Sequence, residues 1–455
     1  MEHKNPPSGP PASTSSASPA PTSTSASGLD SRRAALDLLA RIRRGFLLDE
    51  ALSACISFDE LEGPDRSFAY ALTVTVLRRR GTIDHLLGAY IDRPLPKKLA
   101  RVMDILRLAA AQTLFLGTPD HAAVSTAVTL AGDRKEIAGY AKLINAVARK
   151  VAKAGTAALE KVPARADTPA WMWRSWERNY GPQGTRAIAE AHRQEPPLDL
   201  TLKNPADATL WADRLQAETL PTGSLRLRNI SDVKKLDGFG DGVWWVQDTA
   251  ASLPTRLLGD VSGKKVFDLC AAPGGKTLQL AAAGAEVISV DISDPRLQRV
   301  RENLGRTGLT AAIVTEDVLR WSPDEKADAI LLDAPCSATG TIRRHPDIPW
   351  VKHETDIAAL TSLQARMIDH ALSLLKPGGT LIYCVCSLQA AEGEKQAQAA
   401  LKRHDKLTRK AVTADEISGF GEAINRHGDL RTLPSMLAEK GGMDGFYAAR
   451  FILAA

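Results

Sequence analysis

Acidic and sulfur-bearing side chains follow four apolar runs in the second half of the chain. Each run has the length of a β-strand. The side chains are Asp291 in SVD, Asp317 in TED, Asp333 and Cys336 in LLDAPC, and Cys384 and Cys386 in YCVCS. A carboxylate accepts hydrogen bonds from the hydroxyl and amino groups of a nucleoside, and a thiolate is a strong nucleophile. This set of groups therefore predicts chemistry on a nucleotide-like ligand.

The segment CAAPGGKT, which follows an earlier apolar run, is the loop that could hold such a ligand. Its Gly-Lys-Thr ending matches the end of a phosphate-binding loop. The first glycine of that pattern would fall at Cys270, and Pro273 lacks a backbone N–H for the phosphate. The G-x-G-x-x-G dinucleotide fingerprint is absent as well. We therefore expect S-adenosylmethionine, with Asp291 on the ribose hydroxyls and Asp317 on the adenine amino group.

The two thiols Cys336 and Cys386 predict nucleophilic catalysis on a pyrimidine. Carbon 5 of cytosine is too weak a nucleophile to take a methyl group unaided. A thiolate that adds to carbon 6 makes the ring an enamine, and carbon 5 can then attack a sulfonium methyl. Asp333 can help by protonating or hydrogen bonding ring nitrogen 3, and a base must later remove the carbon 5 proton. These residues alone do not say which cysteine attacks.

The remaining cysteines admit plainer interpretations. A metal site would use Cys336, Cys384, Cys386 and His345, but ordinary Cys-x-x-Cys or His-x-x-x-His spacing is missing, so we expect no metal. Cys55 and Cys270 are predicted to be small packing residues. Five scattered cysteines do not form a disulfide framework, and they favour a reducing cytoplasm.

Apolar runs and helical segments alternate from Lys265 onward, and this alternation predicts how the reactive groups meet. The runs are KVFDLC, AEVISVD, AAIVTED, ADAILLD and GTLIYCVCS. Continuous apolar strands between helices predict an α/β fold with a parallel sheet that is covered on both faces. Ligands bind such sheets at the carboxyl ends of the strands, where the acids and thiols stand.

The first third of the chain has a different pattern. Apolar residues recur at spacings of three and four between residues 31 and 154, which predicts an all-helical domain. Its arginines form either solvated helix faces or a phosphate-binding surface. They are Arg32, Arg33, Arg41, Arg43, Arg44, Arg78, Arg79 and Arg80. Before this region, residues 5–28 are rich in Pro, Ser, Ala and Thr, which predicts a disordered tail.

Residues 168–246 have mixed character and predict a connecting subdomain. Two tryptophan-rich segments, WMWRSWERNY and VWWVQD, are either core packing or a surface on which bases stack. The whole chain has 455 residues and a net charge of +5, which is compatible with an anionic partner but does not require one. The sequence shows neither a signal-peptide core nor an apolar run long enough to span a bilayer.

Four segments together resemble a known family. DLCAAPGGKT, DAPCSATGTIRRHPDI, YCVCS and LPSMLAEKGGMDGFYAARF are closely similar to motifs of the Sun family of RNA cytosine-5 methyltransferases. The helical region resembles a NusB-type RNA-binding domain. The resemblance implies a Rossmann-like S-adenosylmethionine methyltransferase domain, preceded by an all-α NusB-like domain and a small mixed subdomain. It also implies RNA as the partner, most of all small-subunit ribosomal RNA.

The resemblance also assigns roles to individual residues. It implies Cys386 as the nucleophile, Cys336 as the residue that assists product release, and Asp333 as a catalytic acid. The implied donor site is Cys270, Ala271, Ala272, Pro273, Gly274, Gly275, Lys276, Asp291, Asp317 and Asp333. The chain departs from the family pattern twice: Val385 replaces a usual Thr before the nucleophile, and Ala338 replaces a usual Gly. Neither departure removes a reacting group.

These observations together predict an S-adenosylmethionine-dependent enzyme that methylates carbon 5 of a cytosine in RNA. The expected divisions are a tail at 1–29, the helical domain at 30–155, the connecting subdomain at 165–245 and the methyltransferase domain at 246–455. We expect Arg343 and Arg344 near the target base, an RNA partner, no membrane and no stable protein partner. The alternatives are the same chemistry on tRNA or DNA, and a non-catalytic RNA-binding factor that keeps the fold.

Overall fold

The computed structural model describes residues 26–230 and 232–455, and these divide into two compact units. The first unit contains the described residues up to Asp37, with Cys55–Thr73 and Leu86–Glu160. The second contains Leu38–Ala54, Val74–His85 and Lys161–Ala455. The predicted tail lies outside the described residues, except for residues 26–29, which already belong to the first helix. Two segments that we placed in the helical domain, 38–54 and 74–85, group instead with the second unit.

The region before residue 155 is helical throughout, as predicted. Its helices are α1 (Ala26–Arg43), α2 (Leu48–Ser53), α3 (Ile56–Asp59), α4 (Gly63–Arg78), α5 (Arg80–Gly88), α6 (Ala100–Leu114), α7 (Asp120–Gly132), α8 (Lys135–Ala138) and α9 (Ala141–Ala154). Pro119 directly precedes α7, where a proline does not disturb a helix. In the first unit α6, α7 and α9 contact one another through buried aliphatic side chains, among them Ile105, Val124 and Val147.

The arginines of α1 do not form one phosphate-binding face. Arg32 is buried and its Nε donates to Gln112 Oε1 at 2.7 Å. Arg33 pairs with Asp30 and Asp133, both at 2.8 Å. These two cations are therefore engaged within the protein, whereas Arg43 and Arg44 are exposed at the end of the helix.

The connecting subdomain contains helices α10 (Ala170–His192) and α11 (Ala208–Leu215) and a four-stranded antiparallel sheet. The strands, in spatial order, are β2 (Glu218–Thr219), β3 (Leu225–Leu227), β1 (Leu198–Leu202) and β4 (Trp244–Val246). Trp176, Trp244 and Trp245 are buried, which decides between the two interpretations of these tryptophans in favour of packing.

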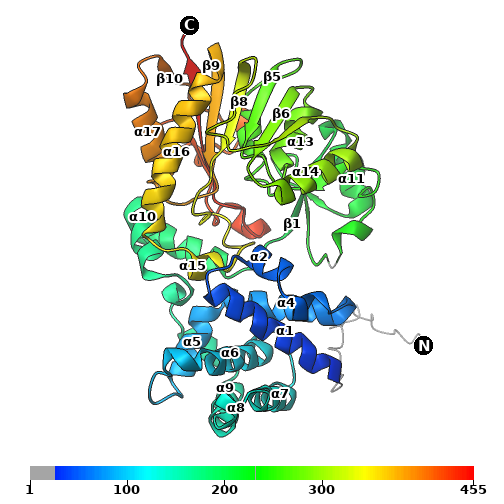
Figure 1. Cartoon of the computed structure of the whole chain (residues 1–455), viewed down its shortest axis with the longest axis vertical. Helices are drawn as coiled ribbons and strands as arrows, with labels where there is room; N and C mark the ends of the chain where they lie inside the picture. Colours follow the sequence, from blue (N-terminus) through cyan, green and yellow to red (C-terminus); the bar gives the residue numbers. More distant parts are fainter. Residues whose placement is uncertain (1–25, 231) are drawn as a thin grey trace, which may run out of the picture. The chain divides into compact units, whose positions relative to one another are not determined.

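The second sheet carries the predicted reactive residues. Its strands are β5 (Lys265–Leu269), β6 (Glu286–Asp291), β7 (Ala312–Thr315), β8 (Ala327–Asp333), β9 (Leu375–Val385), β10 (Leu407–Arg409), β11 (Leu430–Arg431) and β12 (Tyr447–Leu453). The order is β10-β12-β9-β8-β5-β6-β7, and β11 pairs with β12 (Figure 1). The five predicted strands, β5 to β9, are parallel. The sheet as a whole is mixed, because β12 runs antiparallel to β9.

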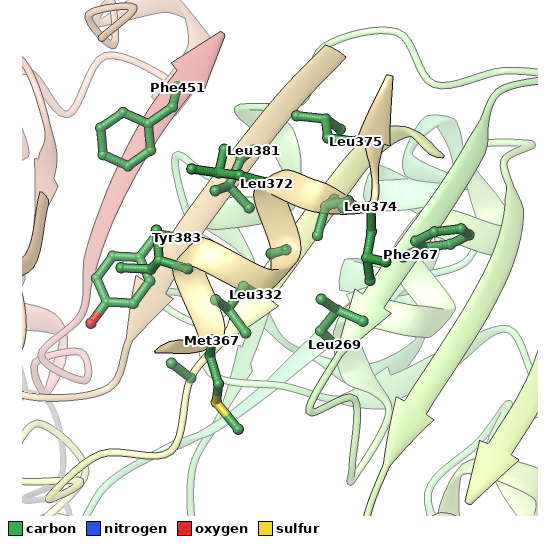
Figure 2. Packing of buried hydrophobic residues seen from close by; sticks show 14 of the residues in the cluster. Phe267, Leu269, Leu332, Met367, Leu372, Leu374, Leu375, Leu381, Tyr383 and Phe451 are labelled. Carbon is green, nitrogen blue, oxygen red and sulfur yellow. The ribbon is translucent and has the colours of Figure 1, made fainter. Parts of the chain in front are cut away.

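Two layers of helices enclose the central strands. The helices of this region are α12 (Leu253–Arg256), α13 (Gly275–Ala282), α14 (Asp294–Thr307), α15 (Ile348–Val351), α16 (Asp356–Ser373) and α17 (Glu394–Arg403). Alternate strand residues point to opposite faces. Leu332 and Tyr383 pack against Met367 of α16, as Figure 2 shows. Their neighbours Leu331 and Ile382 pack in the cluster that includes α12 and α13. The predicted covering of both faces is confirmed.

A search of the described residues found no helix long and apolar enough to cross a membrane.

Candidate active site

The loop between β5 and α13 is held close to the neighbouring strand. The amide groups of Cys270 and Ala271 both donate to the carbonyl oxygen of Val290, at 2.8 and 3.1 Å. Cys270 has φ +63° and Gly274 has φ +102°, so the turn uses left-handed backbone twice. A Cβ on Gly274 would lie 3.0 Å from the side chain of Val300. The glycine therefore allows the loop to lie against α14.

Asp291 ends β6 and is hydrogen bonded to this loop. Its side chain is buried, and its oxygens accept from the amides of Ala272 at 3.1 Å and Ser293 at 3.0 Å. Asp317 lies two residues beyond the end of β7, and its Oδ1 accepts from the amide of Leu319 at 3.0 Å. Both predicted donor-site acids thus stand at the carboxyl edge of the sheet, and each is oriented by local amide groups.

Asp333 ends β8 and contacts Lys276 in the first turn of α13. Lys276 Nζ donates to Asp333 Oδ2 at 2.8 Å and lies 4.9 Å from the ring centre of Phe446. Burial alone would lower the pKa of Lys276, but the surrounding negative groups, Asp333 first among them, together outweigh burial and the pKa is raised. The resemblance placed both residues in the donor site, yet it gave no sign of this ion pair. The alternation of side chains along a strand would have indicated it, because Asp333 lies on the same face of the sheet as Leu331, which packs on the α13 side.

The two predicted catalytic thiols meet at the same edge. Cys336 Sγ lies 3.5 Å from Cys386 Sγ, and both side chains are half-buried. The pKa of Cys336 is raised well above its ordinary value, first by the hydrogen bond with Cys386 and then by burial. Sequence reasoning placed these two cysteines together without a distance, and the structure supplies one that suits a shared hydrogen bond.

Cys384 differs from its neighbours, although it also ends β9. Its side chain is fully buried and its thiol donates to Asp333 Oδ1 at 3.7 Å. Cys270 packs against the core, as predicted, and burial raises its pKa. Among the residues that the structure describes, no group of three or more His, Cys, Asp or Glu side chains could hold a metal ion.

Arg343 and Arg344, which we expect near the target base, are both paired with buried acids. Arg343 is fully buried, and its Nη1 lies 3.5 Å from Asp444. Arg344 pairs with Asp248 at 2.6 Å and with Asp444 at 3.2 Å. Runs of basic residues can therefore neutralise buried acids, and the sequence RR alone does not distinguish that role from phosphate binding.

A basic pocket lies beside the segment that follows Cys386. It has a volume of about 540 Å³ and is lined by Arg178, Lys395, Arg426 and Arg431, among others. Arg431 Nη1 donates to the carbonyl oxygen of Ser387 at 2.5 Å, so the pocket adjoins the thiol-bearing loop. Glu394 and Glu422 also line it, and Glu394 is paired with Arg431.

Known proteins match this chain over most of its length. A family model described as 16S rRNA methyltransferase RsmB/F matches residues 255–452, and the NusB family model matches residues 29–153. A ribosomal RNA small subunit methyltransferase B from Citrobacter koseri is 35% identical over 406 residues, which are 85% of this chain and 91% of the relative. The chain belongs to the RsmB/F methyltransferase family. It is an S-adenosylmethionine-dependent methyltransferase.

Another relative agrees with this membership in the RsmB/F family, and two solved structures share the fold. A protein of the same description from Klebsiella pneumoniae is 35% identical over 74% of this chain and 82% of its own. The crystal structure of PH0851 has a TM-score of 0.72 at 20% identity, covering 93% of this chain and 98% of its own. The structure of NSun6 from Pyrococcus horikoshii with SFG has a TM-score of 0.55 at 18% identity, covering 63% of this chain and 98% of its own. These two likenesses show the fold.

The residues of this RsmB/F family member fit the methyl donor. S-adenosylmethionine carries a sulfonium and an ammonium group, and the carboxyl edge presents the carboxylates of Asp291, Asp317 and Asp333 around one tight loop. Beneath that loop, Oδ1 of buried Asp268 has no hydrogen-bond partner. An anionic edge suits a cationic donor.

Proposed function

We propose that this enzyme transfers the methyl group of S-adenosylmethionine to carbon 5 of a cytosine in small-subunit (16S) ribosomal RNA. The transfer passes through a covalent bond between Cys386 and carbon 6. The separation of 3.5 Å between the two sulfurs, at the sheet edge beside the donor loop, is the observation that carries this proposal. The matching relatives are named ribosomal RNA small subunit methyltransferases, which supports the choice of RNA.

Each step has a residue to perform it. The thiolate of Cys386 adds to carbon 6, and the electron pair of the carbon 5–carbon 6 double bond becomes available at carbon 5. The bound donor supplies an electrophilic methyl group at its sulfonium, and carbon 5 takes that methyl. A base then removes the carbon 5 proton, the double bond re-forms, and the bond from carbon 6 to Cys386 breaks. The products are 5-methylcytosine in RNA, S-adenosylhomocysteine and the free thiolate of Cys386, and the carbon 5 proton is left on the base.

Cys336 is suited to the base role because its acidity depends on Cys386. The hydrogen bond with Cys386 is the largest cause of its raised pKa, so the proton is held on Cys336 in the free enzyme. Once Cys386 is a neutral thioether, that cause weakens. The Cys336 thiol is then more acidic, at the stage when a base is needed.

Asp333 and Lys276 are assigned to the part of the cytosine ring that lies across from carbon 6. We assign Asp333 to the hydrogen-bonding edge of cytosine around nitrogen 3, where proton donation favours thiolate addition. Lys276, which donates to Asp333, keeps its own proton because its pKa is raised, and it holds the carboxyl group of Asp333 in place. The loop residues Cys270, Ala271, Ala272, Pro273, Gly274 and Gly275, with Asp291 and Asp317, hold the donor.

The RNA must present an unstacked base, since carbon 6 is not reachable inside a helix. We assign the basic pocket beside the Cys386 loop to a neighbouring part of the RNA backbone. Its cations Arg178, Lys395 and Arg426 are exposed, and Arg431 connects it to Ser387. The NusB-like region is proposed as a second RNA contact. Ribosomal RNA as substrate also implies that the enzyme acts in the cytoplasm.

Two substitutions test the roles of the thiols. Cys386→Ala removes the nucleophile and should abolish methyl transfer from labelled donor to RNA. Cys336→Ala should block release and leave RNA covalently bound, visible as a slow band on a denaturing gel. Cys55→Ala, a buried cysteine of the first unit, is the matched control and should keep turnover. Full activity of Cys386→Ala would overturn the nucleophile assignment. Normal turnover without an adduct in Cys336→Ala would overturn the release role.

The rival substrates and the non-catalytic alternative call for one further experiment. Mapping 5-methylcytosine in all RNA of a deletion strain should show one or more sites lost from small-subunit ribosomal RNA. Loss from tRNA instead would redirect the substrate assignment. Absence of any lost site would favour an RNA-binding factor that keeps the fold.

A further inference from the structure

Glu392 is a fully buried acid close to both thiols, and none of the functions described so far uses it. Its Oε1 accepts from the amide of Ser337 at 2.8 Å and from Gln364 Nε2 at 3.3 Å. Its Oε2 accepts from the hydroxyls of Ser337 and Ser387, both at 2.5 Å. One carboxylate therefore accepts four hydrogen bonds within the protein.

The two serines place this carboxylate directly behind the active site. Ser337 follows Cys336 and Ser387 follows Cys386, so Glu392 joins the residues next to each thiol. The hydroxyls of Ser337 and Ser387 also lie 3.1 Å apart. The two loops come from different strands and lie 50 residues apart in the chain. Glu392 is thus the shared anchor of two loops that β-sheet pairing alone does not hold.

The carboxylate of Glu392 is held by neutral hydrogen-bond donors, and the guanidinium of Arg431 reaches the carbonyl oxygen of Ser387 rather than this carboxylate. Among the ion pairs found in the described residues, none includes Glu392, whereas the nearby Glu394 pairs with Arg431 at 2.9 Å. Burying an unpaired charge opposes folding unless its hydrogen bonds are satisfied. Four neutral donors satisfy it here, and both thiol loops supply some of them. A geometric role accounts for this arrangement better than a contribution to stability.

We propose that Glu392 is a positioning residue that sets the spacing of the Cys336 and Cys386 thiols. This proposal rests on the proposed function, in which the two sulfurs act on adjacent carbons of one ring. The permitted displacement of each sulfur is then small compared with the 3.5 Å between them. Glu392 acts through Ser337 and Ser387 and does not itself touch the substrate.

Two measurements on Glu392→Ala test the proposal. The kcat for RNA methylation should fall about 100-fold, the size of effect that misplacement by about 1 Å produces, while KM for RNA and for S-adenosylmethionine stays within about twofold. The second measurement is bridging of the two thiols by dibromobimane, which fluoresces strongly only after it has reacted with both. The bridging rate should fall with kcat, with Cys336→Ala giving the background signal.

Conservative and control variants separate positioning from folding. Glu392→Gln keeps the shape and one acceptor, so it should restore most of the bridging rate and part of kcat. Glu416→Ala removes another partly buried acid, the partner of Arg450, without touching either thiol loop, and should change neither readout. If Glu392→Ala does not fold, Ser387→Ala removes a single hydrogen bond to the same carboxylate and should lower both readouts to a smaller extent.

The outcomes distinguish this proposal from the proposed function. Wild-type bridging and wild-type kcat in Glu392→Ala, or in Ser387→Ala where that variant replaces it, would overturn the positioning role. Lost bridging in Glu392→Ala together with full activity of Cys386→Ala would instead overturn the proposed mechanism, while the structural role of Glu392 would stand.

Discussion

Asp268 is the residue whose environment most clearly predicts a pH effect on stability. It lies within β5 below the donor loop, fully buried, and accepts from Thr277 Oγ1 at 2.6 Å. Burial raises the pKa of this carboxyl group from 3.8 to about 7. The folded protein therefore binds more protons than the unfolded chain between pH 3.8 and about 7. Across that window its free energy of unfolding decreases as the pH rises.

Asp268→Asn should remove this loss of stability. The midpoint of thermal unfolding of the variant, compared with wild type, should rise as the pH increases from about 4 to 7 and then level off. Asp294→Asn is the control. Its pKa is lowered, first by the hydrogen bond from Arg301, so its midpoint relative to wild type should fall over the acidic range. Parallel pH profiles for Asp268→Asn and wild type would contradict the assignment.

At the scale of residues, sequence reasoning located the reactive groups but not their supports. The end of an apolar run marks the end of a strand in the sequence. This mark was enough to place Asp291, Asp333, Cys336 and Cys386 at the carboxyl edge of the sheet. Glu392 was not foreseen, because its main partner Ser337 lies 55 residues away and no local pattern connects them. Burial decides the remaining differences. Cys384 and Cys386 follow the same apolar run in the sequence, but the side chain of Cys384 is fully buried and its thiol donates to Asp333.

Among the elements, the loop from Cys336 to Thr341 depends on a close approach between backbones. The amide of Gly340 donates to Cys386 O at 3.0 Å, and the amide of Gly445 donates to Gly340 O at 2.9 Å. A Cβ on Gly340 would lie 1.8 Å from the carbonyl oxygen of Gly445 and 3.0 Å from that of Cys386. Any side chain at this position must therefore push the two loops apart.

Gly340→Ala should reduce methyl transfer at least 10-fold and lower stability by about 2 kcal/mol or more, because backbone atoms cannot move aside cheaply. Activity assays and urea unfolding measure the two effects. Gly305→Ala is the matched control. Gly305 lies within α14 with open space around it, so alanine there should raise stability by about 0.5–1 kcal/mol. Equal behaviour of the two variants would contradict the close approach.

The strands were predictable where helices alternate with them. The observed β5, β6 and β8 differ by at most one residue from the runs KVFDLC, AEVISVD and ADAILLD. The antiparallel strand β12 was not foreseen, since no crossover helix of the repeating pattern precedes it. Its place between β10 and β9 arises from pairing between distant residues, such as Tyr447 with Val385. Such pairing is a tertiary event that local periodicity does not report.

For the whole molecule, the net charge of +5 predicts RNA binding less well than the positions of the exposed cations do. The triple variant Arg178→Glu, Lys395→Glu, Arg426→Glu reverses the exposed cations of the basic pocket. It should raise KM for RNA at least 10-fold with little change in kcat. The dependence of RNA binding on salt should also weaken, since each lost phosphate contact lowers the slope by about 0.7.

A control for this variant must reverse charge elsewhere in the second unit. Arg214→Glu, Lys234→Glu and Lys264→Glu together make the same change in net charge away from the pocket residues. They should leave KM and the salt slope near the wild-type values. If both triple variants weaken RNA binding equally, the effect belongs to overall charge and the pocket has no special role.

The grouping of residues 38–54 and 74–85 with the second unit has a bearing on how such enzymes can be rebuilt. The amide of Leu48 donates to Asp347 at 3.0 Å, and the indole of Trp350 donates to Leu77 O at 2.8 Å. Asp347 and Trp350 both follow the loop from Cys336 to Thr341 in the chain. Replacing the first 160 residues with another helical domain would therefore remove two segments that hydrogen bond to the catalytic unit, and a working chimera has to retain residues 38–54 and 74–85.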